Sequence, residues 1–190
     1  HSIDTSDEFY EAEKTYYDQE TPAFEHLAVQ YRKLLYASPY REEIEKVIGG
    51  PAIRNIELAS KSVSEEIIPL MQEENALVTE YEKLLASAAI DWDGDTLNLS
   101  TIIPYLNHKD RDVRRRAAKK VNTFYESVEA QLDDLYDKLV KNRTQQAKKL
   151  GFETYTELGY CRMQRNSYWR EDVERFRAQV KKEWVPFAEE

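Results

Sequence analysis

The stretch from Asp110 to Leu150 constrains the fold more than any other part of the chain. It contains neither Gly nor Pro, and its apolar residues recur mostly at intervals of three or four. This spacing predicts an amphipathic helix, with Asp110 or Asp112 as its N-cap and Gly151 just beyond its end. Such a helix is roughly 60 Å long, whereas a compact chain of this size is about 40 Å across. The sequence therefore predicts either an elongated protein or a strut within a larger body.

Most of the remaining chain also has the apolar spacing of helices. At Thr21-Pro22, either a second helix begins with Pro in its first turn, or one long helix continues with a kink. Three pairs of residues have the spacing of a capping box and predict helix starts: Thr5 with Glu8, Ser62 with Glu65, and Thr154 with Glu157.

One segment departs from the helical pattern. Residues 90–99 alternate between apolar and polar side chains around Asp93-Gly94, which predicts a small β-hairpin. A two-stranded hairpin is marginal by itself, so it must lie against helices. We expect Ser100 to cap a short helix that follows and ends near Leu106.

Composition agrees with an all-α protein. Charged residues make up 33% of the chain, the net charge is -9, and the chain has only 5 Gly and 6 Pro. We predict an elongated multi-helix array with one long helix at about 110–150 and one hairpin at about 90–99. The acidity argues against nucleic-acid or anionic-membrane partners, and Cys161 is the only cysteine, so we expect a cytoplasmic protein.

Both ends of the sequence predict a fragment. The chain begins at His1 rather than Met, and it ends in an amphipathic segment interrupted only by Pro186. Natural domain ends are more often polar and disordered. An exposed core face on such a fragment predicts self-association through apolar surface.

Residues that could hold a metal ion do not form a known pattern. Neither His26 nor His108 has a Glu three residues before it, and neither begins an H-E-x-x-H sequence. Asp91, Asp93 and Asp95 lack the spacing of an EF-hand, because Gly94 falls at the fourth position rather than the sixth. We therefore expect ordinary histidines, a tight turn and no metal bound by this chain.

Two further features have both a functional and a structural interpretation. Cys161 has no neighbouring His in the sequence, which favours a buried structural thiol over a nucleophile. The basic cluster from Lys109 to Lys120 could bind phosphate or carboxylate groups. In so acidic a chain, we favour a solvated helix start whose cations pair with Asp110, Asp112 and neighbouring acidic helices.

The segment Glu157–Tyr168 combines Gly159 within a predicted helix with two Tyr and two Arg. A helical Gly is unfavourable by about 1 kcal/mol relative to Ala, so we expect close backbone packing there. Arg and Tyr side chains are good hydrogen-bond donors to a peptide or a carboxylate. Structural packing is the alternative explanation of the same residues.

Leu150–Tyr168, with the sequence LGFETYTELGYCRMQRNSY, resembles a signature region of the oligoendopeptidase F family, which is related to thimet oligopeptidase. Two other stretches are similar to the family: residues 75–86, NALVTEYEKLLA, and the segment from Asp93-Gly94 to the D-R-D-V-R-R start of the long helix. The resemblance covers most of the chain.

This resemblance implies a mostly helical zinc metallopeptidase that cleaves short peptides in a deep channel. The zinc ligands of the family lie on an H-E-x-x-H helix and a later Glu, which this sequence lacks, so no catalytic or zinc residue is carried over. The full-length parent would bind zinc and peptides, whereas this chain would be inactive scaffold and channel wall. Tyr160, Arg162 and Arg165 are the candidates to face the channel.

The resemblance also implies a domain organisation. Residues 1–107 would form an N-terminal helical region with the hairpin, and residues 108–190 would form the long helix and the beginning of a truncated catalytic domain. A non-catalytic helical interaction module is the alternative, since it explains the acidity and the missing catalytic residues without truncation. A nucleic-acid adaptor that uses Lys109–Lys120 is a third option.

Overall fold

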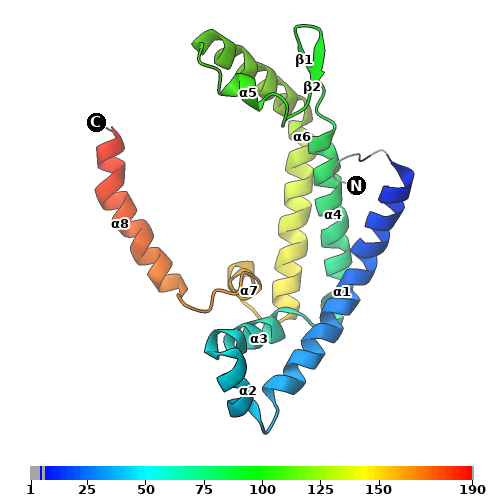
Figure 1. The fold of residues 1–190 in the computed structure, drawn as a ribbon, viewed down its shortest axis with the longest axis vertical. Coiled ribbons are helices and arrows are strands. Elements are labelled where there is room, and N and C mark those ends of the chain that lie inside the picture. Colours follow the sequence, from blue (N-terminus) through cyan, green and yellow to red (C-terminus); the bar gives the residue numbers. More distant parts are fainter. Residues whose placement is uncertain (1–4, 6, 190) are drawn as a thin grey trace. The chain divides into compact units, whose positions relative to one another are not determined.

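The computed structural model describes Thr5 and residues 7–189 (Figure 1). His1, on which part of the fragment prediction rests, lies outside these residues. The described chain is α-helical apart from one two-stranded antiparallel hairpin, which confirms the predicted fold class. The elements are α1 Glu8–Tyr36, α2 Arg41–Ile48, α3 Gly50–Ser62, the 3-10 turn η1 Glu65–Ile67, α4 Ile68–Ala86, β1 Ile90–Trp92, β2 Asp95–Leu97, α5 Ile103–Leu106, α6 Arg111–Lys149, α7 Tyr155–Arg162 and α8 Arg170–Glu189.

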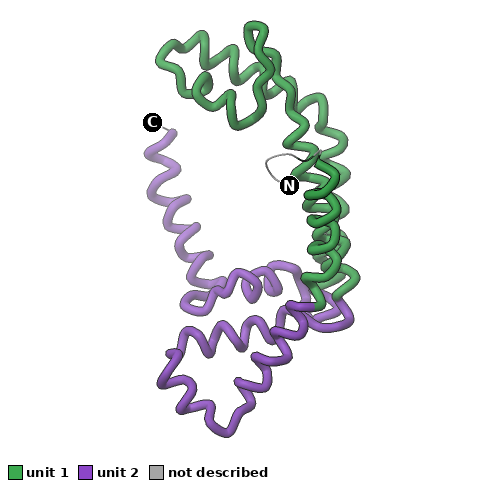
Figure 2. The backbone as a smooth tube through the Cα atoms, turned by 45° about the vertical axis from the view of Figure 1, so that its right-hand side comes forward, with its two compact units in different colours: residues 1–23, 68–146 green, residues 24–67, 147–190 purple. Residues whose placement is uncertain are grey.

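Two compact units are built from alternating parts of the chain (Figure 2). Unit 1 combines the chain up to Ala23 with Ile68–Gln146, and unit 2 combines Phe24–Ile67 with the chain from Ala147 onward. The helices α1 and α6 therefore each contribute residues to both units. The predicted division at residue 107, between an N-terminal helical region and the beginning of a catalytic domain in a longer protein, stays a prediction.

The long helix α6 begins and ends where the sequence predicts. The backbone N–H of Asp112 donates to Asp110 Oδ1 at 2.8 Å, so Asp110 caps the first turn. Gly151 has a φ of 82°, and the N–H of Phe152 donates to the carbonyl of Ala147 at 2.9 Å. This is a Schellman motif, which satisfies carbonyl groups that the helix end would otherwise leave without donors.

The helix α1 corrects one predicted cap and decides between two alternatives. Pro22 lies inside a single continuous helix, so no second helix starts at Thr21. The cap comes from Asp7 rather than Thr5, because Asp7 Oδ1 accepts the backbone N–H groups of Phe9 and Tyr10 at 3.0 and 3.1 Å. The charged Asp7 carboxylate satisfies two of the donors at the helix start.

The other two capping boxes are also wrong in part. Ser62 is the last residue of α3, and its hydroxyl donates to the carbonyl of Ala59 at 2.9 Å instead of capping a new helix. Thr154 is the N-cap of α7 but makes no side-chain hydrogen bond there. Glu157 accepts the N–H of Glu153 at 3.1 Å, one residue before the N-cap, and not the N–H of Thr154 that a capping box requires.

Polar contacts join the three helical segments of unit 1. Lys14 Nζ donates to Asp18 Oδ1 and to Thr79 Oγ1, both at 2.6 Å, which links α1 to α4. Asn142 on α6 is buried, and its Nδ2 donates to Glu73 Oε2 on α4 at 2.6 Å. Buried polar groups with partners favour one arrangement of the helices over others.

The hairpin forms as predicted and packs on helices of unit 1. Asp93 and Gly94 have φ angles of 53° and 96°, the left-handed conformation that a two-residue turn between antiparallel strands requires. Ile90 and Trp92 point inward and form a buried cluster with Ile102 and Ala117. This apolar contact supplies the burial that an isolated hairpin lacks.

The turn before α5 differs from the prediction. Asn98, not Ser100, supplies the side-chain acceptor: its Oδ1 accepts the N–H groups of Ser100 and Thr101 at 3.0 and 2.8 Å. An Asn side chain reaches the backbone two and three residues ahead, which is the geometry of an Asx turn.

Unit 2 contains α2, α3, α7 and α8 together with the ends of α1 and α6. The helix α3 contacts both α2 and α7, and Asn166, which follows α7, donates to Asn55 Oδ1 on α3 at 2.6 Å. Among the described residues, no helix is both long enough and apolar enough to cross a membrane.

Candidate functional site

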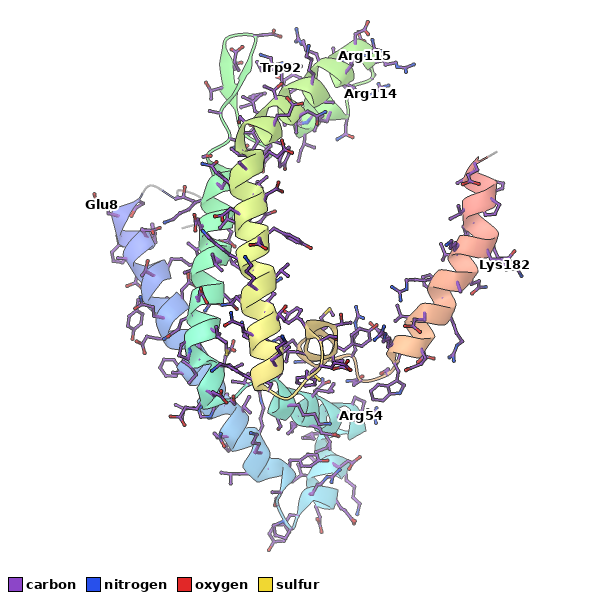
Figure 3. All side chains as sticks on the ribbon, turned by 180° about the vertical axis from the view of Figure 1, so that it is seen from behind. Glu8, Arg54, Trp92, Arg114, Arg115 and Lys182 are labelled. Carbon is purple, nitrogen blue, oxygen red and sulfur yellow. The ribbon has the colours of Figure 1, made fainter. Side chains whose placement is uncertain are left out.

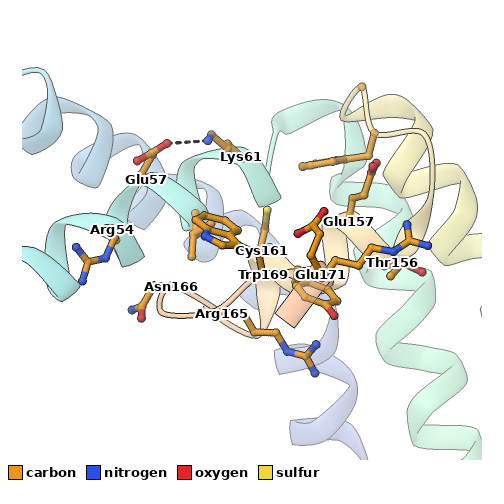
Figure 4. A pocket seen from close by; sticks show the side chains of 15 residues that line it. Arg54, Glu57, Lys61, Thr156, Glu157, Cys161, Arg165, Asn166, Trp169 and Glu171 are labelled. Carbon is orange, nitrogen blue, oxygen red and sulfur yellow. Dashed lines mark hydrogen bonds and ion pairs between the residues drawn. The ribbon is translucent and has the colours of Figure 1, made fainter. Parts of the chain in front are cut away.

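A cavity of about 620 Å³ lies in unit 2, between α3, α7 and the beginning of α8 (Figure 4). Its volume is in the range of sites that bind small molecules or a few peptide residues. The lining combines cationic, acidic and aromatic side chains: Arg54, Glu57, Leu58, Lys61, Gly151, Phe152, Thr156, Glu157, Tyr160, Cys161, Arg165, Asn166, Trp169, Arg170 and Glu171.

The wall formed by α3 consists of residues at helical spacing. Arg54, Glu57 and Lys61 are three and four residues apart, so one face of α3 presents all of them to the cavity. Lys61 Nζ donates to Glu57 Oε1 at 2.7 Å (Figure 4). This hydrogen bond raises the pKa of Lys61 above its ordinary value, so the side chain is a cation at neutral pH.

The wall formed by α7 includes Tyr160 and the buried Cys161. Burial raises the pKa of the Cys161 thiol, and the charges of Glu157 and Glu57 act in the same direction while Lys61 opposes them. The thiol is therefore protonated at neutral pH, and a protonated thiol is a weak nucleophile. This supports the interpretation of Cys161 as a structural residue.

Gly159 on α7 is not explained by close packing, contrary to the expectation from sequence. A Cβ atom at this position would lie 3.8 Å from Tyr155 Cε1 and 4.0 Å from Met163 Cε, which are ordinary contact distances. Both neighbours belong to side chains rather than to an adjacent backbone. The structure therefore has room for Ala at position 159.

Arg165 is held in the cavity wall by the end of α7. Gln164 has a φ of 51°, and the N–H of Arg165 donates to the carbonyl of Tyr160 at 3.2 Å. The backbone of Arg165 therefore completes the C-terminal cap of α7. The guanidinium carbon lies 4.2 Å from the centre of the Tyr160 ring and 5.5 Å from that of Tyr168. Stacking on Tyr160 favours one orientation of the cation.

Of the three residues that the sequence predicts for a channel, the fold brings two into the cavity and leaves one outside it. Tyr160 and Arg165 line the same cavity, whereas Arg162 is not part of its lining. The Arg162 guanidinium lies 6.0 Å from the centre of the Tyr155 ring, within the same helix. Their role with a substrate stays a prediction.

The sequence did not indicate the residues of α3 and α8 that complete the cavity. Arg54, Glu57 and Lys61 are ordinary charged residues on a helix, and nothing in their spacing relates them to α7. Trp169 follows the signature segment directly, and its exposure could not be judged without the turn that precedes α8. Only the packing of α3 on α7 brings these side chains together.

The two internal histidines have local partners. His26 lies 2.8 Å from the Gln30 amide nitrogen, and His108 Nδ1 accepts the N–H of Asp110 at 3.1 Å. Within the part of the chain that the structure describes, no three His, Cys, Asp or Glu side chains lie close enough together to hold a metal ion. The described residues therefore do not fit a zinc site.

Part of the basic cluster at the start of α6 pairs with acids and carbonyl groups, but its shorter ion pairs join it to the hairpin rather than to the predicted acidic helices. Arg116 Nη2 bonds to Asp93 at 2.6 Å, and Lys120 Nζ bonds to Asp91 at 3.3 Å. Arg114 donates to the carbonyl of His108 at 2.7 Å. Figure 3 shows Arg114 and Arg115 on this part of α6 and Trp92 on the adjacent hairpin. These acids are thus occupied by cations of the same unit.

Comparison with known proteins relates the chain to peptidases. The model of the Peptidase M3 N-terminal domain matches residues 1–63. A structure described as oligoendopeptidase F is 40% identical and superimposes with a TM-score of 0.92, over 99% of this chain and 33% of that protein. None of the curated proteins compared with the chain matches it.

Two further solved structures have the same likeness. PZ peptidase A, solved with an inhibitor, is 41% identical over 99% of this chain and 34% of its own, with a TM-score of 0.92. A protein described as oligoendopeptidase F from Bacillus anthracis strain Ames is 40% identical over 98% of this chain and 34% of its own, also at 0.92. The chain therefore spans about a third of the length of the structures it matches.

Proposed function

Because this chain belongs to the oligoendopeptidase F family, we propose that it is part of a longer peptidase that hydrolyses short peptides. The observation that carries the proposal is the match of 99% of the chain, at 40% identity, to a structure described as oligoendopeptidase F. The matched region is about a third of that protein. The activity of the whole protein is therefore proposed from its relatives.

Within the longer protein, this chain is scaffold and one wall of the peptide channel. The cavity of unit 2 supports this role, because it places Tyr160 and Arg165 beside apolar and charged side chains in a space of about 620 Å³. Arg162 supports the wall from outside the cavity, through its position over Tyr155. Peptides are recognised by such mixtures of aromatic surface and a few placed polar groups.

We assign the hydrolytic step to the part of the longer protein outside this chain. The 190-residue sequence has no H-E-x-x-H motif, and the described residues do not fit a metal site. Zinc in the longer protein would supply a Lewis acid and an activated water. This chain would bind and orient the peptide without taking part in bond cleavage.

Substitutions in the longer peptidase test the role of the cavity. Tyr160→Ala and Arg165→Ala should each lower kcat/KM for short peptides by about tenfold, because each removes an interaction with the bound peptide. Arg177→Ala is the matched control, since Arg177 is an exposed arginine of α8 outside the cavity. Steady-state kinetics with a quenched fluorescent peptide provide the measurement.

Two outcomes of this experiment would contradict the proposal. Unchanged kcat/KM in both cavity variants would remove the channel role of Tyr160 and Arg165. Zinc-dependent hydrolysis of the same peptide by the purified 190-residue chain would contradict its role as scaffold without catalytic residues.

A further inference from the structure

The charges that line the cavity of unit 2 differ in whether they have partners. Lys61 pairs with Glu57 at 2.7 Å, and Arg170 pairs with Glu174 at 2.9 Å, so these two cations are largely neutralised. None of the ion pairs among the described residues involves Arg54 or Arg165. The cavity therefore contains two guanidinium groups that can accept an external anion as partner.

The other acidic side chains of the lining balance the formal charge of Arg54 and Arg165 but form no ion pair with either among the described residues. Besides Glu57, these are Glu157 and Glu171. Glu157 accepts the backbone N–H of Glu153 at 3.1 Å, and Glu171 lies in the first turn of α8, where the helix dipole stabilises a negative charge. Among the described residues, no ion pair joins Arg165 to either of these carboxylates.

Arg165 is prepared for an anion by its surroundings. Its backbone N–H is fixed by the cap of α7, and its guanidinium lies over the Tyr160 ring at 4.2 Å. Stacking uses the face of the guanidinium and leaves its N–H edge available, and that edge has the spacing of a carboxylate. The side chain is half-buried and already restricted, so it loses less conformational freedom when an anion binds.

Apolar surface adjoins these cations. Phe152, Leu58 and the indole of Trp169 belong to the same lining, and the Trp169 side chain is largely exposed. A ligand with a carboxylate next to an apolar side chain therefore matches the cavity better than a small inorganic anion, which would use the charge alone.

We propose that the cavity of unit 2 binds a peptide through a carboxylate, with Arg165 as the principal donor, Arg54 as a second positive charge, and Trp169 and Phe152 against the adjacent apolar side chain. That the ligand is a peptide rests on the proposed function, whereas recognition of its carboxylate rests on the cavity itself. The carboxylate belongs either to the C-terminus of the peptide or to an acidic side chain.

Trp169 fluorescence in the 190-residue chain provides a direct binding measurement. Three probes separate the two sources of the carboxylate: N-acetyl-Gly-Phe-Leu with a free C-terminus, the same peptide as its amide, and N-acetyl-Glu-Phe-Leu amide. The free acid should bind at least about tenfold more tightly than the neutral amide if the C-terminus is recognised. Tighter binding of the Glu peptide would instead identify an acidic side chain. The Trp169→Phe variant gives the background from the other two tryptophans.

Variants of the chain test the named donors. Arg165→Gln should weaken the preferred peptide by about tenfold, Arg165→Lys by less, and Arg177→Gln not at all. Circular dichroism checks that each variant is folded. If Arg165→Gln unfolds the chain, Arg54→Gln, on the exposed face of α3, is the variant to measure, and it should also weaken binding. Added salt should weaken the carboxylate peptides more than the amide.

The proposal is overturned if neither carboxylate peptide binds more tightly than the neutral amide, or if Arg165→Gln, folded, binds as tightly as Arg177→Gln. Its failure is separable from that of the proposed function. Carboxylate-dependent binding to this chain, together with unchanged kcat/KM of the cavity variants in the longer peptidase, would support the binding site and contradict the channel role.

Discussion

Two glycines near α7 show how one residue type has opposite energetic roles. Gly151 has a φ of 82° and terminates α6, where its left-handed conformation allows Phe152 N–H to reach the carbonyl of Ala147. Gly159 lies inside α7, with ordinary contact distances around the position of a Cβ atom. The first position requires a glycine backbone, and the second does not.

Alanine at each position should therefore change the free energy of unfolding in opposite directions. Gly151→Ala should lower it by about 1 kcal/mol, because an L-residue is strained at positive φ. Gly159→Ala should raise it by up to about 1 kcal/mol, because Ala is the better helix former. Urea denaturation of both variants measures the difference. A larger loss for Gly159→Ala than for Gly151→Ala would show that α7 needs a glycine for another reason.

At the scale of elements, the hairpin is held to α6 by two kinds of interaction. Trp92 is 4% exposed within the apolar cluster of unit 1. Arg116 on α6 covers the Trp92 ring at 4.1 Å and bonds to Asp93 at 2.6 Å, but about half of the Arg116 side chain is exposed. Burial of a large aromatic ring contributes much more than an exposed ion pair, so the indole should dominate.

Trp92→Ala should lower the free energy of unfolding by about 3–5 kcal/mol, since it leaves a cavity in the cluster. Arg116→Gln should lower it by less than about 1 kcal/mol, because solvent screens the charges that it removes. Denaturation of both variants, with hydrogen exchange at the backbone amides of Ile90 and Leu97, measures the loss and whether the hairpin opens first. Equal losses in the two variants would contradict the dominance of apolar burial.

At the scale of the whole molecule, much apolar surface faces solvent although the net charge is -9. The helix α8 has no buried residue, and its large apolar side chains recur at helical spacing. Phe176, Trp184 and Phe187 are each about two thirds exposed, at 65%, 65% and 70%. Continuous apolar surface of this kind favours association when nothing else covers it.

We expect the chain to associate with a second copy, as the sequence predicts. In sedimentation velocity, its mass should rise above 22.4 kDa with increasing concentration. Phe176→Glu should shift the chain toward the monomer by placing a charge in the apolar stripe. Gln179→Glu adds the same charge on an exposed part of α8 and should have little effect. A mass of 22.4 kDa at every concentration would contradict the prediction.

The amino-acid sequence by itself determined the helices, the hairpin and the family. Apolar spacing, Asp110 and Gly151 located α6 to within a residue at each end, because helix formation depends on neighbours three and four positions away. The turn was predictable for the same reason, because the positive φ angles of Asp93 and Gly94 depend on these two residues themselves. Predictions were less accurate for caps, where Asp7 and Asn98 took the roles expected of Thr5 and Ser100, because several nearby polar side chains compete for the same donors.

Only the tertiary structure decided the composition of the cavity and the division into units. Tyr160 and Arg165 were found from the segment that follows α6, but Arg54 and Lys61 come from α3, far away in the sequence. Which helices pack together depends on the summed burial of whole faces, not on any motif of a few residues. For the same reason, the chain's alternation between unit 1 and unit 2 was not visible in the order of its residues.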